Sequence, residues 1–152
     1  MDKDKIIIYT DGACSNNQSS DNIGGYGAIL TYKDHTKEIF GGRTNTTNNI
    51  MELTAMIEAL KLVKNRMIET EVHSDSAYIV NCINLKWYEK WKTNNWKNSK
   101  KDPVKNKELW EELIDLIESF NDIKIIKVKG HSGIDLNEKA DELANKGIES
   151  VR

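Results

Sequence analysis

The stretch that decides the fold is Ile6-Ile7-Ile8-Tyr9-Thr10-Asp11-Gly12. Its four consecutive apolar residues predict a strand, Ile6–Tyr9, buried on both faces of a sheet. We expect Asp11 to close this strand, and no helix follows directly for it to cap. A turn-forming Asp-Gly pair is the structural interpretation. The alternative is a carboxylate that the buried strand holds in place for chemistry.

The pattern of the remaining chain predicts an α/β fold built on one mixed sheet. Further strands are expected at residues 24–30, 37–43, 70–74 and 123–129, of which the first two form an antiparallel meander with 6–9 and the others are parallel strands. Helices are expected at residues 50–63, 76–85, 105–120 and 136–145, with Gly147 stopping the last. This order of elements fits a five-stranded sheet with helices on both faces.

Composition indicates one small globular unit. The chain has 152 residues and one proline, so a single domain over residues 1–152 is expected. Cys14 and Cys82 are too few and too far apart for a disulfide framework or a cysteine-based zinc site. No long apolar stretch follows the charged start, Met1-Asp2-Lys3-Asp4-Lys5. We therefore expect a soluble, cytoplasmic protein without a membrane segment.

The charges are distributed unevenly along the chain. Residues 86–107 carry 8 Lys/Arg against 2 Asp/Glu, whereas residues 1–85 carry 8 against 11 and residues 108–152 carry 6 against 11. A basic block in an otherwise acidic protein suggests a patch that meets a polyanion. The alternative is a solvated lysine-rich helix. On a helix, Trp87 and Trp91 would share one face, beside a face with Lys86 and Lys90.

Two acids lie where ordinary helix caps are found. Asp75 follows the expected strand 70–74 at the start of a helix, and either Asp75 or Ser74 caps that helix in the structural interpretation. Glu52 lies in the first turns of helix 50–63, where Asn49-Ile50-Met51-Glu52 has the spacing of a capping box. Each acid thus has a structural interpretation beside a functional one.

Glu52 and Asp141 have no Lys or Arg three or four residues away on their helices. Acids at the border of a core are unfavourable unless an ion neutralises them. Asp11 and Asp75 follow strands whose carboxyl ends are where ligands bind in open α/β sheets. If the four acids converge in the fold, they would make an oxygen-ligand site of the kind that Mg²⁺ or Mn²⁺ prefers.

His131 lies in a glycine-flanked loop, Gly130-His131-Ser132-Gly133, after the last expected strand. A mobile surface histidine without a partner is the structural interpretation. The functional interpretation is that His131 takes part in proton transfer, because the loop precedes the helix that carries Asp141.

Six motifs occur in a fixed order over nearly the whole chain. They are Tyr9-Thr10-Asp11-Gly12; Gly24-Gly25-Tyr26-Gly27-Ala28; Thr46-Thr47-Asn48-Asn49 with Met51-Glu52-Leu53; Ser74-Asp75-Ser76 with Tyr78; Pro103-Val104-Lys105-Asn106; and Gly130-His131-Ser132-Gly133 followed by Asn137-Glu138 and Asp141-Glu142-Leu143-Ala144. One such motif alone is weak evidence, but the ordered set is specific. It resembles type 1 ribonuclease H, the bacterial-type ribonuclease HI.

This resemblance implies a ribonuclease H-like fold and an endoribonuclease that hydrolyses the RNA strand of RNA–DNA hybrids without strong sequence specificity. The products would carry 5′-phosphate and 3′-hydroxyl ends. The family's four acids correspond to Asp11, Glu52, Asp75 and Asp141, which would hold two Mg²⁺ ions, with Mn²⁺ as a substitute. Two such ions clamp the attacking and leaving oxygens of a phosphodiester. His131 would assist proton transfer or product departure.

The resemblance also implies a surface for the hybrid. The basic block resembles the protrusion of many type 1 members, expected at about residues 85–102, and its lysines would hold the nucleic-acid backbone. We expect its tryptophans to anchor the protrusion rather than to stack on bases. RNA would be distinguished from DNA through 2′-hydroxyls in the minor groove. The residues implied are Lys86, Lys90, Lys97, Lys100 and Lys101 on the protrusion, Cys14, Asn17, Asn48 and Asn49 along the minor groove, and Thr47 and Asn106 in a phosphate pocket.

Two departures from the family pattern bear on the hybrid surface. Ala77 stands where many bacterial members have a glutamine that contacts bases, and Asn45 stands where an arginine is common in the phosphate pocket.

A hybrid-binding protein that cuts poorly is one alternative function. It is disfavoured because a binder gains nothing from unpaired acids beside phosphates. A resolvase- or transposase-like nuclease is another, and the chain lacks an extra domain for it. We expect a monomer.

Overall fold

The computed structural model describes residues 5–15, 22–97, 101–129 and 135–151. Within these ranges the chain forms five strands and five helices in the predicted order. The strands are β1 (Ile6–Ser15), β2 (Ile23–Tyr32), β3 (His35–Thr44), β4 (Thr70–Ser74) and β5 (Ile123–Lys127). The helices are α1 (Asn48–Lys61), α2 (Ala77–Asn84), α3 (Trp87–Thr93), α4 (Lys107–Glu118) and α5 (Asp135–Ser150).

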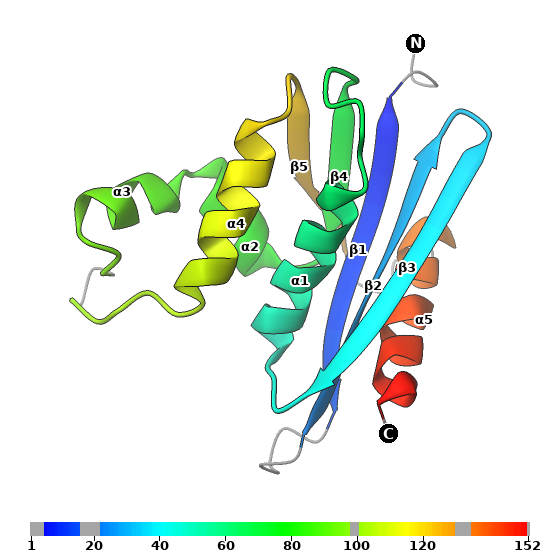
Figure 1. Cartoon of the computed structure of the whole chain (residues 1–152), viewed down its shortest axis with the longest axis horizontal. Helices are drawn as coiled ribbons and strands as arrows, with labels where there is room; N and C mark the ends of the chain where they lie inside the picture. The colour runs from blue at the N-terminus through cyan, green and yellow to red at the C-terminus, as the bar shows by residue number, and fades with distance from the viewer. Residues whose placement is uncertain (1–4, 16–21, 98–100, 130–134, 152) are drawn as a thin grey trace.

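The strands form one mixed sheet in the order β3-β2-β1-β4-β5. The pairs β1–β2 and β2–β3 are antiparallel, and the pairs β1–β4 and β4–β5 are parallel. Helix α1 packs on β1 and β2 with α4 beside it, while α5 crosses β1, β2 and β3 on the other face (Figure 1). Helix α3 extends away from the sheet. The predicted five-stranded sheet with helices on both faces is confirmed.

Strand β1 is longer than predicted, and Asp11 lies inside it rather than at its end. The parallel pairing of β1 with β4 runs only to the pair Tyr9–His73. The antiparallel pairing with β2 continues to the pair Ser15–Ile23. The prediction that Asp11 closes the strand is therefore wrong, because β2 supplies hydrogen-bond partners beyond the apolar run. Asp11 instead lies just past the point where β4 leaves β1.

Neither acid with a capping interpretation caps a helix. The hydroxyl of Thr47 accepts a hydrogen bond from the Ile50 amide at 3.1 Å and caps α1. The hydroxyl of Ser76 accepts from the Ile79 amide at 3.3 Å and caps α2. The capping interpretations of Glu52 and Asp75 are thus wrong, since neighbouring hydroxyl residues already satisfy these helix starts.

Helix α5 passes through Gly147, which was predicted to stop it. A Cβ atom on Gly147 would overlap the carbonyl oxygen of Gly41 on β3 and lie 3.1 Å from the Cα of Gly25 on β2. The glycine is present because the helix backbone lies directly against the sheet backbone there. Its role is a tertiary contact, which a local pattern of helix stop signals does not reveal.

The core has two parts, one on each face of the sheet. The larger part includes residues of α1, α2 and α4 such as Leu53, Ile79 and Trp110. The smaller part lies beneath α5 and consists of Tyr9, Ile29, Ala140 and Leu143, with partly buried neighbours.

The tryptophans of the basic block join the larger core. Trp91 is buried, with its ring 5.5 Å from that of Trp110 and 6.1 Å from that of Trp96. Trp87 is half-buried against the same core. The prediction that tryptophans anchor this segment is confirmed.

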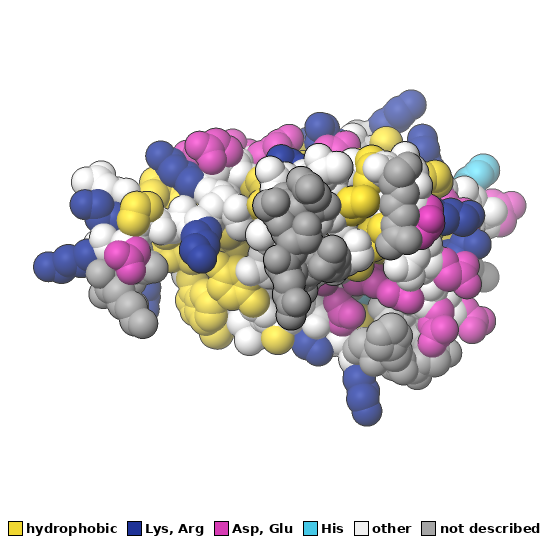
Figure 2. Space-filling model, turned by 90° about the horizontal axis from the view of Figure 1, so that it is seen from below, with side chains coloured by type: hydrophobic (Ala, Val, Ile, Leu, Met, Phe, Trp, Pro, Cys, Tyr) yellow, Lys and Arg dark blue, Asp and Glu magenta, His cyan; other side chains and the backbone are white. Residues whose placement is uncertain are grey.

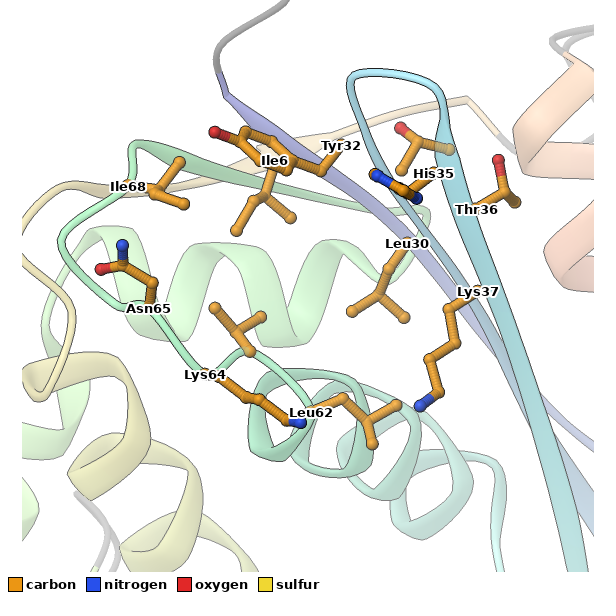
Figure 3. Close-up of a pocket in the computed structure, with 12 residues that line it drawn as sticks. Ile6, Leu30, Tyr32, His35, Thr36, Lys37, Leu62, Lys64, Asn65 and Ile68 are labelled. Atoms are coloured by element: carbon orange, nitrogen blue, oxygen red, sulfur yellow. The ribbon is translucent and has the colours of Figure 1, made fainter.

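An apolar hollow of about 420 Å³ lies near the start of β1 (Figure 3). Ile6, Leu30, Leu62 and Ile68 form much of its lining, and no acid lines it. None of the helices in the described part of the chain combines the length and apolar character needed to cross a membrane.

We predict that Gly147→Ala destabilises the protein by about 1–3 kcal/mol, because the new methyl group meets backbone that has little room to move. At an ordinary helix position the same change would stabilise by about 1 kcal/mol. Urea denaturation measures the difference, with Asn145→Ala at an exposed position of α5 as the control. A Gly147→Ala protein as stable as the parent would show that α5 does not need this close contact.

Candidate active site

Three acids from three different elements meet beside the end of the β1–β4 pairing. Asp11 comes from β1, Glu52 from α1, and Asp75 from the residue that follows β4. One carboxylate oxygen from each lies within 4.8 Å of the others. Asp141 of α5 is adjacent to this group, since its hydrogen bond and its charge both contribute to the raised pKa of Asp11. The structure thus brings together all four acids singled out in the sequence.

Glycines allow the helices to bring these acids to β1. A Cβ atom on Gly12 would lie 2.5 Å from the backbone nitrogen of Glu52, so only a glycine lets α1 approach this closely. On the opposite face, a Cβ on Gly27 would lie 2.6 Å from the backbone nitrogen of Ala144 in α5. Gly27 is the register partner of Asp11. Helix α1 therefore reaches β1, and helix α5 reaches β2 from the other face, at the level of Asp11.

Burial and like charge act together on Asp11. Burial is the largest cause that raises its pKa to about 8, followed by the charge of Asp75 and by the hydrogen bond and charge of Asp141. The amide of Gly12 donates a hydrogen bond to Oδ1 of Asp11 at 2.9 Å and partly opposes this effect. Without a cation, Asp11 is therefore largely protonated at neutral pH.

Glu52 is even less exposed to solvent. It is 9% exposed, and burial, followed by the charges of Asp11 and Asp75, raises its pKa well above the usual range of a glutamate. Its Oε1 atom is buried without a hydrogen-bond partner in the described structure. A buried oxygen of this kind is unfavourable unless something coordinates it.

These residues fit a divalent metal centre. In the described part of the chain, the cause that lowers the pKa of Asp11 and of Glu52 is the backbone amide of Gly12, and no cationic side chain is among the main groups that oppose the increase. Nearby, burial lowers the pKa of His73, which favours the neutral form of this ring. Clustered carboxylate oxygens are the ligands that hard divalent cations prefer. Asp11, Glu52, Asp75 and Asp141 are the residues that could hold such ions.

A polar surface lies beside the acids at the start of α1. Thr47 and Asn106, both predicted to bind a phosphate, line one hollow of about 370 Å³ together with Tyr78. Asn48 and Asn49 line a neighbouring hollow with Thr47. The Sγ atom of Cys14 lies 3.8 Å from the carbonyl oxygen of Thr46, at the edge of this region.

Asn22 is a residue of this surface that the sequence analysis missed. Its side-chain amide donates to the carbonyl oxygen of Thr46 at 3.1 Å and accepts from the Thr46 amide at 2.9 Å. It thus fixes the turn that carries the predicted binding residues, and it lines the same hollow as Asn48. No local signal distinguished it within a long polar loop.

Four predicted binding lysines, Lys86, Lys90, Lys97 and Lys101, are exposed. Figure 2 shows several Lys and Arg side chains, with an acidic one among them, at the end of the molecule where α3 lies, and side chains of both charges over the rest of this face. Asn17, Lys100 and His131 lie outside the described residues.

Of the two departures from the family pattern, Ala77 is exposed at the start of α2, and Asn45 adopts a positive φ of 58° in the turn before Thr46.

Comparison with known proteins gives the family. A sequence model described as RNase H matches residues 3–149. The chain belongs to the ribonuclease H family. A ribonuclease H of Clostridium botulinum is 52% identical over 145 residues, which are 95% of this chain and 96% of that protein. The crystal structure of a type 1 RNase H with the type 2 active-site motif is similar, with a TM-score of 0.83 and 26% identity over 95% of this chain and 72% of that one.

One similar structure contains nucleic acid. It is a foamy viral protease-reverse transcriptase in complex with an RNA/DNA hybrid, with a TM-score of 0.77 and 25% identity over 97% of this chain and 20% of that one. Family membership makes the present chain a nuclease that hydrolyses the RNA strand of RNA–DNA hybrids. Its carboxylate cluster has the composition of a divalent-metal site and fits two-metal-ion catalysis.

The raised pKa values predict a metal affinity that depends on pH. Because Asp11 and Glu52 must lose protons before they can ligate a cation, affinity should increase as pH rises from 6 towards the Asp11 pKa of about 8. Calorimetric titration with Mg²⁺ in buffers of different ionisation enthalpy should also detect proton release at pH 7. Equal affinity at pH 6 and pH 8.5, with no proton release, would contradict this electrostatic account.

Proposed function

We propose that the chain cuts the RNA strand of RNA–DNA hybrids with two Mg²⁺ ions held by Asp11, Glu52, Asp75 and Asp141. The observation that carries this proposal is the cluster of partly buried carboxylates at one point of a ribonuclease H fold, where burial and mutual repulsion raise the pKa values of Asp11 and Glu52. Mn²⁺ is expected to substitute because it accepts the same oxygen ligands. The products would carry 5′-phosphate and 3′-hydroxyl ends.

The four acids have distinct tasks in this proposal. Asp11, central in the cluster, would ligate both ions. By the family resemblance, Asp141 would serve the side of the attacking water, and Glu52 and Asp75 the side of the leaving oxygen. When bound, the ions supply an activated water and charge stabilisation at the phosphodiester. The protein supplies rigid, partly desolvated ligands whose mutual repulsion favours occupancy of the site.

The polar surface beside the acids would receive the hybrid. Cys14, Asn17, Asn48 and Asn49 would follow the minor groove, where 2′-hydroxyls distinguish RNA from DNA. Thr47 and Asn106 share a hollow, which supports a joint role in binding a phosphate of the DNA strand. Contacts of this kind position the duplex without reading its sequence.

The protrusion would supply sequence-independent affinity. Its lysines, Lys86, Lys90, Lys97, Lys100 and Lys101, would contact backbone phosphates while its tryptophans anchor it to the core. His131 is proposed to assist proton transfer or product departure. We further propose that the chain acts as a single catalytic domain, as a monomer and in the cytoplasm.

Asp11→Asn should abolish cleavage of a hybrid in Mg²⁺ while leaving hybrid binding intact, because it removes the central metal ligand and no surface contact. A gel assay with labelled RNA–DNA, RNA–RNA and DNA–DNA duplexes, with Mg²⁺ or EDTA, measures this. The parent should cut only the RNA strand of the hybrid. Unimpaired cutting by the variant would refute the metal assignment, and a parent that binds but does not cut would point to a hybrid-binding protein.

Replacing Lys86, Lys90 and Lys97 together by alanine should weaken hybrid binding. It should also make the slope of log K against the logarithm of the salt concentration shallower by about two to three. The matched control replaces Lys33, Lys37 and Lys64, three exposed lysines in and around the hollow of Figure 3. Fluorescence titrations between 50 and about 200 mM salt give both slopes. Equal slopes for the two triple variants would refute a specific role for the protrusion.

A further inference from the structure

Tyr9 and His73 stack on one another across β1 and β4. The two residues are direct partners in the parallel register. Their ring centroids are 4.4 Å apart, with an angle of 10° between the planes. Neighbouring strands in a sheet lie about 4.7–4.9 Å apart. The ring spacing is close to the strand spacing, as expected for paired residues whose side chains project from the same face of the sheet.

The stack lies two residues before two of the four acids along the chain, Asp11 and Asp75. Tyr9–His73 is the last pair in the described register of β1 with β4. Asp11 lies two residues beyond Tyr9 and therefore on the same side of β1, and Asp75 lies two residues beyond His73, directly after β4 ends. Past this point β1 pairs with β2 only, as far as the described register shows. The ring pair is thus the last contact between the two strands before the carboxylates.

Each ring is also held from other directions. Tyr9 is 8% exposed and belongs to the cluster that includes Ala140, one residue before Asp141 in α5, and Leu143, two residues after it. The His73 Nε2 atom lies 3.4 Å from Oε1 of Glu71, whose Oε2 accepts a hydrogen bond from Lys5 at 2.6 Å. The stack therefore links the three elements that carry Asp11, Asp75 and Asp141.

We propose that Tyr9 and His73 are positioning residues that set the separation of the carboxylates of Asp11, Asp75 and Asp141 for Mg²⁺. The inference rests on the proposed function, because the separation matters only if these acids hold ions. Mg²⁺ requires near-ideal octahedral geometry, whereas Ca²⁺ accepts irregular coordination. Loss of the stack should therefore weaken Mg²⁺ binding more than Ca²⁺ binding.

His73 offers a test that separates positioning from folding. Its Nδ1 atom is buried without a hydrogen-bond partner in the described structure, so an apolar replacement removes only the Nε2 contact with Glu71, which keeps its hydrogen bond from Lys5. His73→Leu removes the ring, and His73→Phe keeps one. For the full chain titrated with Mg²⁺ alone and with Ca²⁺ alone, we expect His73→Leu to lose about 3- to 10-fold in Mg²⁺ affinity and less than about 2-fold in Ca²⁺ affinity. His73→Phe should match the parent.

Variants of Tyr9 complete the experiment. Tyr9→Leu should reproduce the selective loss of Mg²⁺ affinity, and Tyr9→Phe should restore it. Ile8→Ala, which removes a fully buried side chain from the α1 side of the same strand, is the control for general destabilisation. Unchanged Mg²⁺ affinity in His73→Leu, or an equal loss of Mg²⁺ and Ca²⁺ affinity in all variants including Ile8→Ala, would overturn the inference. A parent that neither binds Mg²⁺ nor cuts the hybrid would instead refute the proposed function on which it rests.

Discussion

The close approach of two helices to the backbone of one sheet is the constraint on which the rest of the structure depends. Helix α1 reaches β1 at Gly12, and helix α5 reaches β2 and β3 at Gly27 and Gly147. A side chain at any of these positions would push a helix outward and move Glu52 or Asp141 away from Asp11. The cluster of acids is therefore a consequence of backbone packing, and the metal ligands come from rigid elements rather than from a loop.

This packing places negative charges where they repel one another. Burial and neighbouring acids raise the pKa values of Asp11 and Glu52, so the metal-free site holds protons that a divalent cation must displace. The fold supplies the energy that keeps the acids together, and activity is gained at the expense of stability. The hybrid surface does not share this conflict, because its polar residues and lysines remain solvated until nucleic acid arrives.

Much of this could be predicted from sequence, and the failures share one cause. The apolar run Ile6–Tyr9 predicted the central strand, and the ordered motifs predicted the four acids. Gly147 was misjudged as a helix stop because its reason is Gly41, far away in sequence. Glu52 was given a capping role because local spacing does not show that Thr47 already caps α1. The Tyr9–His73 stack depends on strand register, which no local pattern specifies.

The central claim is that the fold forces the acids together against their repulsion. Thermal unfolding of the parent and of Asp11→Asn at pH 9 tests it most directly. The raised pKa means that Asp11 progressively destabilises the metal-free protein as pH rises from its ordinary pKa of 3.8 to about 8, so the full effect is present at pH 9. Asp11→Asn should then be more stable than the parent by about 1–3 kcal/mol without metal, and this advantage should shrink or reverse in saturating Mg²⁺. A metal-free variant less stable than the parent at pH 9 would contradict the account.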